Sequence, residues 1–130
     1  MFGRHRIAEL TDQLTVSRGE QERIQQTLNA IASQIGYIEF SPSGIVESAN
    51  DILLSIVGYE RQEVIGKHHR ALCDSSYTAS LEYQHFWEDL GRGIKKQGTF
   101  PRFAKDGRRV WLEATYFPVT DEDGKVFKVI

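Results

Sequence analysis

Residues 99–119 read TFPRFAKDGRRVWLEATYFPV, two runs of strand-forming residues joined at Asp106-Gly107. An Asp-Gly step between two such runs is a strong signal for a β-hairpin, because glycine readily adopts the positive φ that a tight turn requires. Pro101 cannot donate a backbone hydrogen bond, so we expect the first run, residues 99–104, to lie at the edge of a sheet. The stretch therefore predicts an antiparallel sheet in the final third of the chain.

The second run, residues 109–119, predicts a long strand with two different faces. Side chains of a strand point alternately to opposite sides of the sheet. The alternation puts Trp111 on the outer face, where it needs a covering surface from the amino-terminal helix or a second subunit. The residues expected on the core face are Leu112, Ala114 and Tyr116.

The other elements follow from turn residues, helix caps and apolar spacing. Asn50 is suited to cap a following helix, and Gly58 to end it. A second acidic turn at 121–124 precedes a last strand. The expected strands are 37–40, 45–48 and 125–130, and the expected helices are 51–57, 61–65 and 80–95. One face of the last helix carries Tyr83, Phe86, Trp87, Leu90 and Ile94.

The amino-terminal segment shows aliphatic residues at alternating spacings of three and four. This heptad pattern predicts an amphipathic helix that dimerises through a parallel coiled-coil seam. Packing of the helix on its own domain is an alternative, and Gly19 near the centre could break it into two pieces. The seam reads Ile7, Leu10, Leu14, Ser17, Gln21, Ile24, Leu28, Ile31 and Ile35.

Composition excludes several classes of protein. The 130 residues hold 16 Lys and Arg against 18 Asp and Glu, a net charge of −2, so no cationic field favours nucleic acid or an anionic membrane. The lone Cys73 excludes an internal disulfide and a cysteine-rich zinc site. No run approaches the roughly 20 apolar residues that span a bilayer, and no signal-peptide core follows the first residues. We therefore expect a cytoplasmic protein, or the cytoplasmic part of one.

Several short sequence motifs become informative through their order and spacing along the chain. Each alone is weak evidence, but together they are specific. They are Gly44-Ile45-Val46-Glu47-Ser48-Ala49-Asn50, Val57-Gly58-Tyr59, Glu63-Val64-Ile65-Gly66-Lys67, Lys105-Asp106-Gly107 and Val110-Trp111-Leu112-Glu113-Ala114.

In this order they resemble a PAS domain over residues 34–130, with residues 1–33 as the amphipathic helix. The sequence is also similar to the PAS subgroup of bacterial chemoreceptors and energy-taxis receptors, at residues 68–70, 82–87 and 111–119. The resemblance implies an α+β fold in which a five-stranded antiparallel sheet carries short helices on one face. It also implies a ligand or cofactor pocket and a signal passed to a downstream output domain. Ile130 would fall inside the last strand, so we expect a piece of a longer methyl-accepting chemotaxis protein.

The resemblance also suggests a cofactor. PAS domains of the energy-taxis type bind FAD, and a flavin needs a flat apolar slot with a few polar donors. The residues expected to bind it are Asn50, His69, Arg70, Trp87, Arg102 and Tyr116. Cys73 lies four residues beyond the position of the photoreactive cysteine in light-sensing relatives, so a cysteinyl-flavin photocycle is not expected.

Two function classes remain from the sequence. The first is a sensor of redox state, oxygen or a small ligand through a pocket cofactor, with FAD ahead of haem; His69 or His85 would be the haem ligand. The second is a cofactor-free PAS module for interaction or dimerisation. No motif for catalysis is present, so we do not expect an enzyme.

Overall fold

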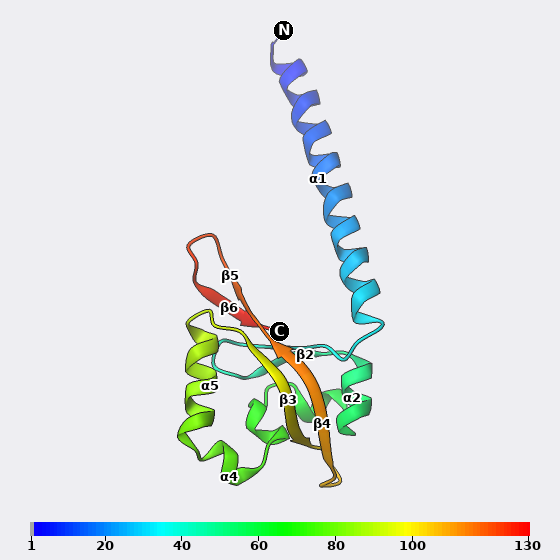
Figure 1. The fold of residues 1–130 in the computed structure, drawn as a ribbon. Coiled ribbons are helices and arrows are strands. Elements are labelled where there is room, and N and C mark those ends of the chain that lie inside the picture. Colours follow the sequence, from blue (N-terminus) through cyan, green and yellow to red (C-terminus); the bar gives the residue numbers. More distant parts are fainter. Residues whose placement is uncertain (1) are drawn as a thin grey trace. The chain divides into compact units, whose positions relative to one another are not determined.

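A computed structural model describes residues 2–130, with side chains from His5 onward, as two compact units. The first unit, residues 1–34, consists of the helix α1 (Phe2–Ala32), and the second comprises residues 35–130. Helix α1 is continuous through Gly19 (Figure 1). The break considered at this glycine does not occur, because the penalty of about 1 kcal/mol falls on one position of a 31-residue helix.

The second unit contains a four-stranded and a two-stranded antiparallel sheet. The first has the order β2 (Val46–Ala49), β1 (Ile38–Phe40), β6 (Val126–Val129) and β5 (Pro118–Thr120). The second pairs β3 (Lys96–Phe103) with β4 (Arg109–Tyr116).

Strands β4 and β5 are the single strand expected at 109–119, interrupted at one residue. Phe117 separates them and exchanges backbone hydrogen bonds with Ile130 in both directions. Counted as one strand, they join the two sheets into the expected five-stranded antiparallel order, with β3 at the edge where Pro101 predicted it.

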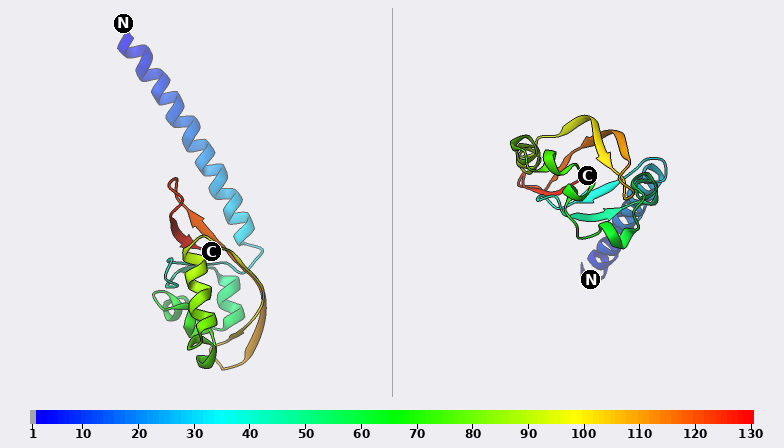
Figure 2. Two further views of the ribbon diagram at one scale, coloured as in Figure 1. Left: turned by 60° about the vertical axis from the view of Figure 1, so that its left-hand side comes forward. Right: turned by 90° about the horizontal axis from the view of Figure 1, so that it is seen from below.

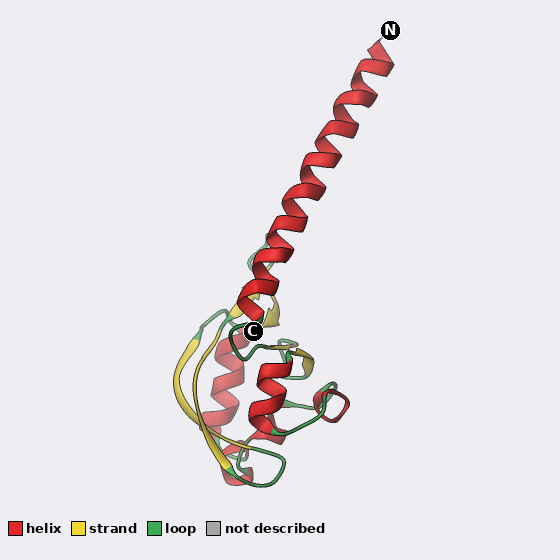
Figure 3. Cartoon of the chain, turned by 90° about the vertical axis from the view of Figure 1, so that its right-hand side faces the viewer, coloured by secondary structure: helices red, strands yellow, loops and turns green. Residues whose placement is uncertain are grey.

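Short helices fill one side of this sheet. Figure 3 shows β3 and β4 curving around them, and Figure 2 shows the same arrangement from two further directions. They are α2 (Asp51–Val57), α3 (Arg61–Val64), the 3₁₀ helix η1 (His69–Leu72), α4 (Ser75–Thr78) and α5 (Leu81–Gly91). The α+β fold expected from the sequence is therefore present.

Two boundaries differ from the sequence-based expectation by more than one residue. The helix predicted to reach residue 95 ends at Gly91, which leaves Ile94 outside it and exposed. Strand β3 begins at Lys96 instead of residue 99. Two features explain these boundaries. Gly93 has a positive φ of 91°, which a helix does not allow, and Lys96, just beyond the helix, pairs with the carboxylate of Asp89 at 2.6 Å.

The alternation along β4 agrees with the prediction. Tyr116 is buried, whereas Trp111 is 60% exposed on the other face. The expected hairpin turn is also present, with φ of 84° at Gly107. No helix within residues 2–130 is both long and apolar enough to cross a bilayer.

Candidate functional site

The space between the sheet and the helices is packed with aromatic rings. His69 from η1 lies at the centre, with its ring 5.4 Å from that of Phe40 in β1 and 5.4 Å from that of Tyr116 in β4. Phe86 and Trp87 from α5 pack against the same imidazole at 6.1 and 5.4 Å. The four aromatic rings around His69 share one core cluster with the aliphatic residues of β2, α2 and β6.

Two polar residues are buried within these rings. His69 is 0% exposed and Arg102 is 2% exposed. Buried polar groups are retained only where hydrogen bonds satisfy them, since an unpaired one destabilises the fold by several kcal/mol. Their partners therefore show how the site is built.

A chain of hydrogen bonds joins four side chains from four elements. Arg102 in β3 donates to the Tyr116 hydroxyl from Nε at 3.2 Å and from Nη2 at 3.0 Å. The Tyr116 hydroxyl lies 3.0 Å from His69 Nε2, and His69 Nδ1 lies 2.8 Å from the Tyr83 hydroxyl in α5. We call Arg102, Tyr116, His69 and Tyr83 the core chain.

Arg102 is a buried cation without a carboxylate partner among the described residues. Its third nitrogen, Nη1, donates to the carbonyl of Pro101 at 2.8 Å. The guanidinium lies 5.0 Å from the ring of Phe100 and 5.7 Å from that of Tyr116. Aromatic faces stabilise a cation only in part, so the interior around His69 is electropositive.

This environment controls the protonation of the core chain. Burial, then the charge of Arg102, holds the pKa of His69 well below its usual 6.5, so the imidazole is neutral. Burial raises the pKa of Tyr116 although Arg102 opposes the shift. Burial also raises the pKa of the half-buried Cys73 to about 11, and its sulfur lies 3.5 Å from His69 Nδ1. Cys73 is therefore a thiol packed against the core chain.

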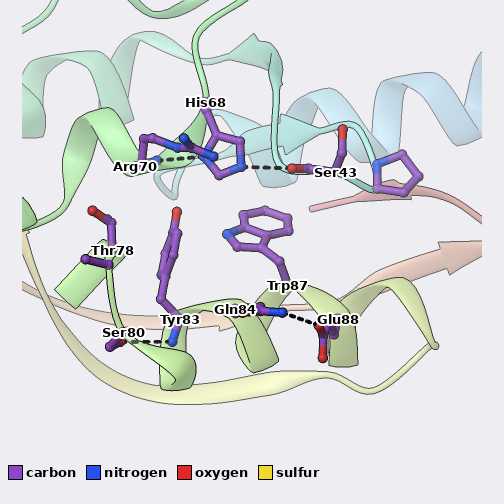
Figure 4. A pocket seen from close by; sticks show the side chains of 11 residues that line it. Ser43, His68, Arg70, Thr78, Ser80, Tyr83, Gln84, Trp87 and Glu88 are labelled. Atoms are coloured by element: carbon purple, nitrogen blue, oxygen red, sulfur yellow. Dashed lines mark hydrogen bonds between the residues drawn. The ribbon is translucent and has the colours of Figure 1, made fainter.

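A surface hollow of about 470 Å³ adjoins the Tyr83 end of the core chain. It lies between the turn at 42–43, η1 and α5, and Figure 4 shows Tyr83 and Trp87 rising from α5 toward His68 and Arg70. The residues lining it are Pro42, Ser43, His68, Arg70, Thr78, Ala79, Ser80, Tyr83, Gln84, Trp87 and Glu88.

His68 forms a fixed wall of the hollow. Its Nδ1 accepts a hydrogen bond from the backbone N–H of Arg70 at 3.0 Å, and its Nε2 lies 2.9 Å from the carbonyl of Ser43. Burial and the nearby Arg70 lower the pKa of His68. A side chain at Gly44 would come within 2.7 Å of His68 Nε2 and 3.0 Å of the Trp87 ring. Gly44 therefore permits the close approach of this turn.

Trp87 lines the hollow and also packs against His69 of the core chain. The residue is 9% exposed, and its buried indole nitrogen has no hydrogen-bond partner among the described residues. It lies close enough to the Tyr83 hydroxyl to lower the pKa of that group, against the larger rise that burial causes.

The six residues expected to bind a cofactor fall into three places. His69, Arg102 and Tyr116 belong to the core chain, and Arg70 and Trp87 line the hollow. Asn50 lies at the start of α2, where its side chain accepts from the backbone N–H of Leu53 and Tyr37 and donates to the carbonyl of Ile35.

Other sequence-derived candidates lie at the margin of this site. His85 is exposed on α5 and lines a second hollow, with Phe86 and Phe100, outside the core chain. Tyr83, which completes the core chain, was expected only as one member of an apolar helix face. The only sign of Tyr83 in the sequence was the spacing of aromatic residues along that face. This spacing predicts that Tyr83 is buried, but it does not identify the group to which its hydroxyl bonds.

The space between the sheet and the helices is filled with side chains. Phe86 meets the rings of Tyr116 and Trp87 edge to face, with centroids 5.0 and 5.7 Å apart. A flavin ring could enter this space only if these side chains moved apart. The polar groups expected to bind a flavin inside the core already bond one another. Haem ligation by His69 would break one of its two hydrogen bonds, since both ring nitrogens are engaged.

Comparisons with known proteins agree on the family. A family model described as "PAS domain" matches residues 34–130. The biofilm dispersion protein BdlA of Pseudomonas aeruginosa is 44% identical over 101 residues, covering 78% of this chain and 24% of BdlA. Phototropin-1A of Oryza sativa is 30% identical over 89 residues, covering 68% of this chain and 10% of phototropin. The chain thus spans a quarter or less of these two relatives.

Solved structures show the same fold at lower identity. A structure of an RNA-binding Light-Oxygen-Voltage receptor superimposes with a TM-score of 0.69 at 20% identity, covering 84% of this chain and 32% of that one. A Light-Oxygen-Voltage domain studied with a flavin analogue gives a TM-score of 0.66 at 20% identity, covering 81% and 79% of the two chains. With the family model spanning residues 34–130, these findings show that the chain belongs to the PAS domain family.

Proposed function

We propose that this PAS domain is the sensing part of a chemotaxis-type receptor and detects a small ligand at the core chain and the adjoining hollow. The observation that carries the proposal is the core chain itself, a hydrogen-bonded polar line through an otherwise aromatic core. Apolar residues of similar size would stabilise such an interior at least as well, so a buried unpaired cation is a functional-site candidate.

The core chain also provides a route for a signal. Its four residues come from α5, η1, β4 and β3, and a ligand changes a protein only by contacting two of its states differently. A ligand that alters the hydrogen bond of Tyr83 acts on His69 and Tyr116, and through them on the β3–β4 strand pair. We propose that the strands pass this change to a downstream output domain, with no reaction catalysed by the domain itself.

A sensor with bound FAD is the second candidate function. The likeness to phototropin, and to a domain studied with a flavin analogue, favours it. The tight ring packing around Phe86 favours a small ligand instead. Haem remains the third option from the sequence.

An absorption spectrum of the chain, freshly purified from its native host, tests this choice. We expect neither the paired near-ultraviolet and blue bands of oxidised flavin nor the intense single band of haem. Stoichiometric flavin bands that persist through gel filtration would replace the first candidate with the second.

Dimerisation through α1 completes the proposed function. Outside Ser17 and Gln21, the seam positions within α1 are aliphatic and exposed. Such a stripe in water is stabilised when it packs against the same stripe of a second copy. We place this dimer in the cytoplasm, where a receptor output domain would act.

A further inference from the structure

The hydrogen bonds of the core chain fix the direction in which each hydroxyl points. The Tyr116 oxygen accepts two hydrogen bonds from Arg102, which use both of its lone pairs. Its own proton must therefore go to His69 Nε2. Because the imidazole is neutral, its proton is on Nδ1 and is donated to the oxygen of Tyr83.

The reverse direction is unfavourable. If His69 Nε2 carried the proton, the Tyr116 oxygen would face three N–H donors, and its own proton would have no acceptor in the buried core. Cys73 agrees with the first direction, because its thiol is positioned to donate to the carbonyl of His69 and its sulfur can accept from Nδ1–H.

The directed chain ends on a donor at the hollow. The Tyr83 hydroxyl accepts from His69, and no acceptor for its own proton is present among the described residues. The indole N–H of Trp87 beside it is buried and turned toward no acceptor at ordinary hydrogen-bond geometry, but it lies close enough to the Tyr83 hydroxyl to lower the pKa of that group. An unpaired buried donor destabilises a protein by about 1–3 kcal/mol, so the site favours an occupant that accepts hydrogen bonds.

The charges around the hollow favour an anionic acceptor. The guanidinium of Arg70 lines the hollow without an ion pair in the part of the chain that the structure describes, and Arg102 lies behind the core chain, also without a carboxylate. Glu88 is the one carboxylate in the lining, and it accepts a hydrogen bond from Gln84 at 3.0 Å. Arg70 thus faces the hollow directly, and the buried charge of Arg102 lies at the far end of the core chain.

We propose that the hollow binds a small oxyanion, a carboxylate or a phosphate, whose oxygens accept hydrogen bonds from Tyr83 and Arg70, beside the buried indole of Trp87. This inference rests on the proposed function and names the ligand class of the same site. Binding would fix the Tyr83 proton toward the ligand and so stabilise the direction of the whole core chain. Tyr83 becomes a binding residue that the sequence did not single out.

The test follows the indole proton of Trp87 by NMR in the chain of residues 1–130. Trp111→Phe removes the other indole from the exposed sheet face and leaves one resonance. Sodium phosphate and sodium succinate are titrated separately against sodium chloride of equal ionic strength. Because Trp87 lines the hollow, we expect a saturable shift of this resonance with one of the two, and the anion that saturates identifies phosphate or carboxylate as the ligand group.

Two variants and a matched control decide where the anion binds. Arg70→Gln should weaken binding about tenfold or more, since it removes a charge-assisted hydrogen bond, and Tyr83→Phe about fivefold. Arg108→Gln removes the same charge from the exposed β3–β4 turn and should leave the affinity unchanged.

Two results would overturn the inference: no saturable shift with either anion, or equal losses in the Arg70 and Arg108 variants. Neither would remove the proposed sensing role of the core chain, which is judged by signalling in the His69 variant described below.

Discussion

At the scale of single residues, the neutral state of His69 makes stability depend on pH. Its pKa is about 6.5 in the unfolded chain and well below that in the folded one, so the unfolded state binds more protons below pH 6.5. The contribution of neutral His69 to the free energy of unfolding is fully present above pH 6.5, and it is lost as the pH decreases through that value. Between pH 7.5 and 5.5 this residue alone should lower the free energy of unfolding by about 1.4 kcal/mol.

Urea unfolding at the two pH values measures the effect. His69→Gln should reduce the pH dependence by about that amount, while His85→Gln, an exposed site, should keep it. Part of the dependence will persist in both variants, because the pKa of His68 is also lowered. An unchanged pH dependence in the His69 variant would mean that this imidazole is charged in the folded state.

A second prediction at this scale separates function from stability in the core chain. Tyr116→Phe removes the acceptor of Arg102 and leaves a buried cation with one backbone partner, which should destabilise the fold by about 2–3 kcal/mol. Adding Arg102→Met to this variant should restore more than half of the loss, because an apolar pair avoids the unpaired charge. The comparison is made by urea unfolding at neutral pH.

If the double variant is less stable than Tyr116→Phe alone, Arg102 stabilises the fold through its aromatic contacts. The core chain would then need no functional explanation.

At the scale of elements, α1 is the clearest test of the dimer. Ile24→Asp together with Ile31→Asp places charges in the apolar seam and should convert dimers to monomers in sedimentation. The matched control, Val16→Asp with Ala30→Asp, adds the same charges to α1 outside the seam and should remain dimeric. A dimer that survives the seam substitutions would assign self-association to another surface, with exposed Trp111 on the sheet as the first candidate.

At the scale of the whole molecule, local sequence signals predicted the fold well. Asp106-Gly107 set the hairpin and Asn50 capped its helix, because turns and caps depend on a few neighbouring residues. The end of α5 and the start of β3 were less predictable, since the ion pair between Asp89 and Lys96 and the positive φ of Gly93 set them, and neither follows from the apolar periodicity.

The site was predicted only in part, because its hydrogen bonds join residues that are far apart in the sequence. His69, Arg102 and Tyr116 were expected near one another from the resemblance, but not their bonds. His69 bonds Tyr83 and Tyr116, which lie 14 and 47 residues away in the chain, so periodicity carries no information on the pairing. A network of this kind becomes visible only when the sheet and the helices are packed together.

The central claim, that the core chain receives the signal, is tested most directly by the stimulus response of the full-length receptor carrying His69→Ala, with His85→Ala as the control. Urea unfolding first confirms that both variants are folded under the assay conditions. The account predicts that the His69 variant loses the response and that the His85 variant keeps it. A folded His69 variant that responds like the parent would contradict the claim.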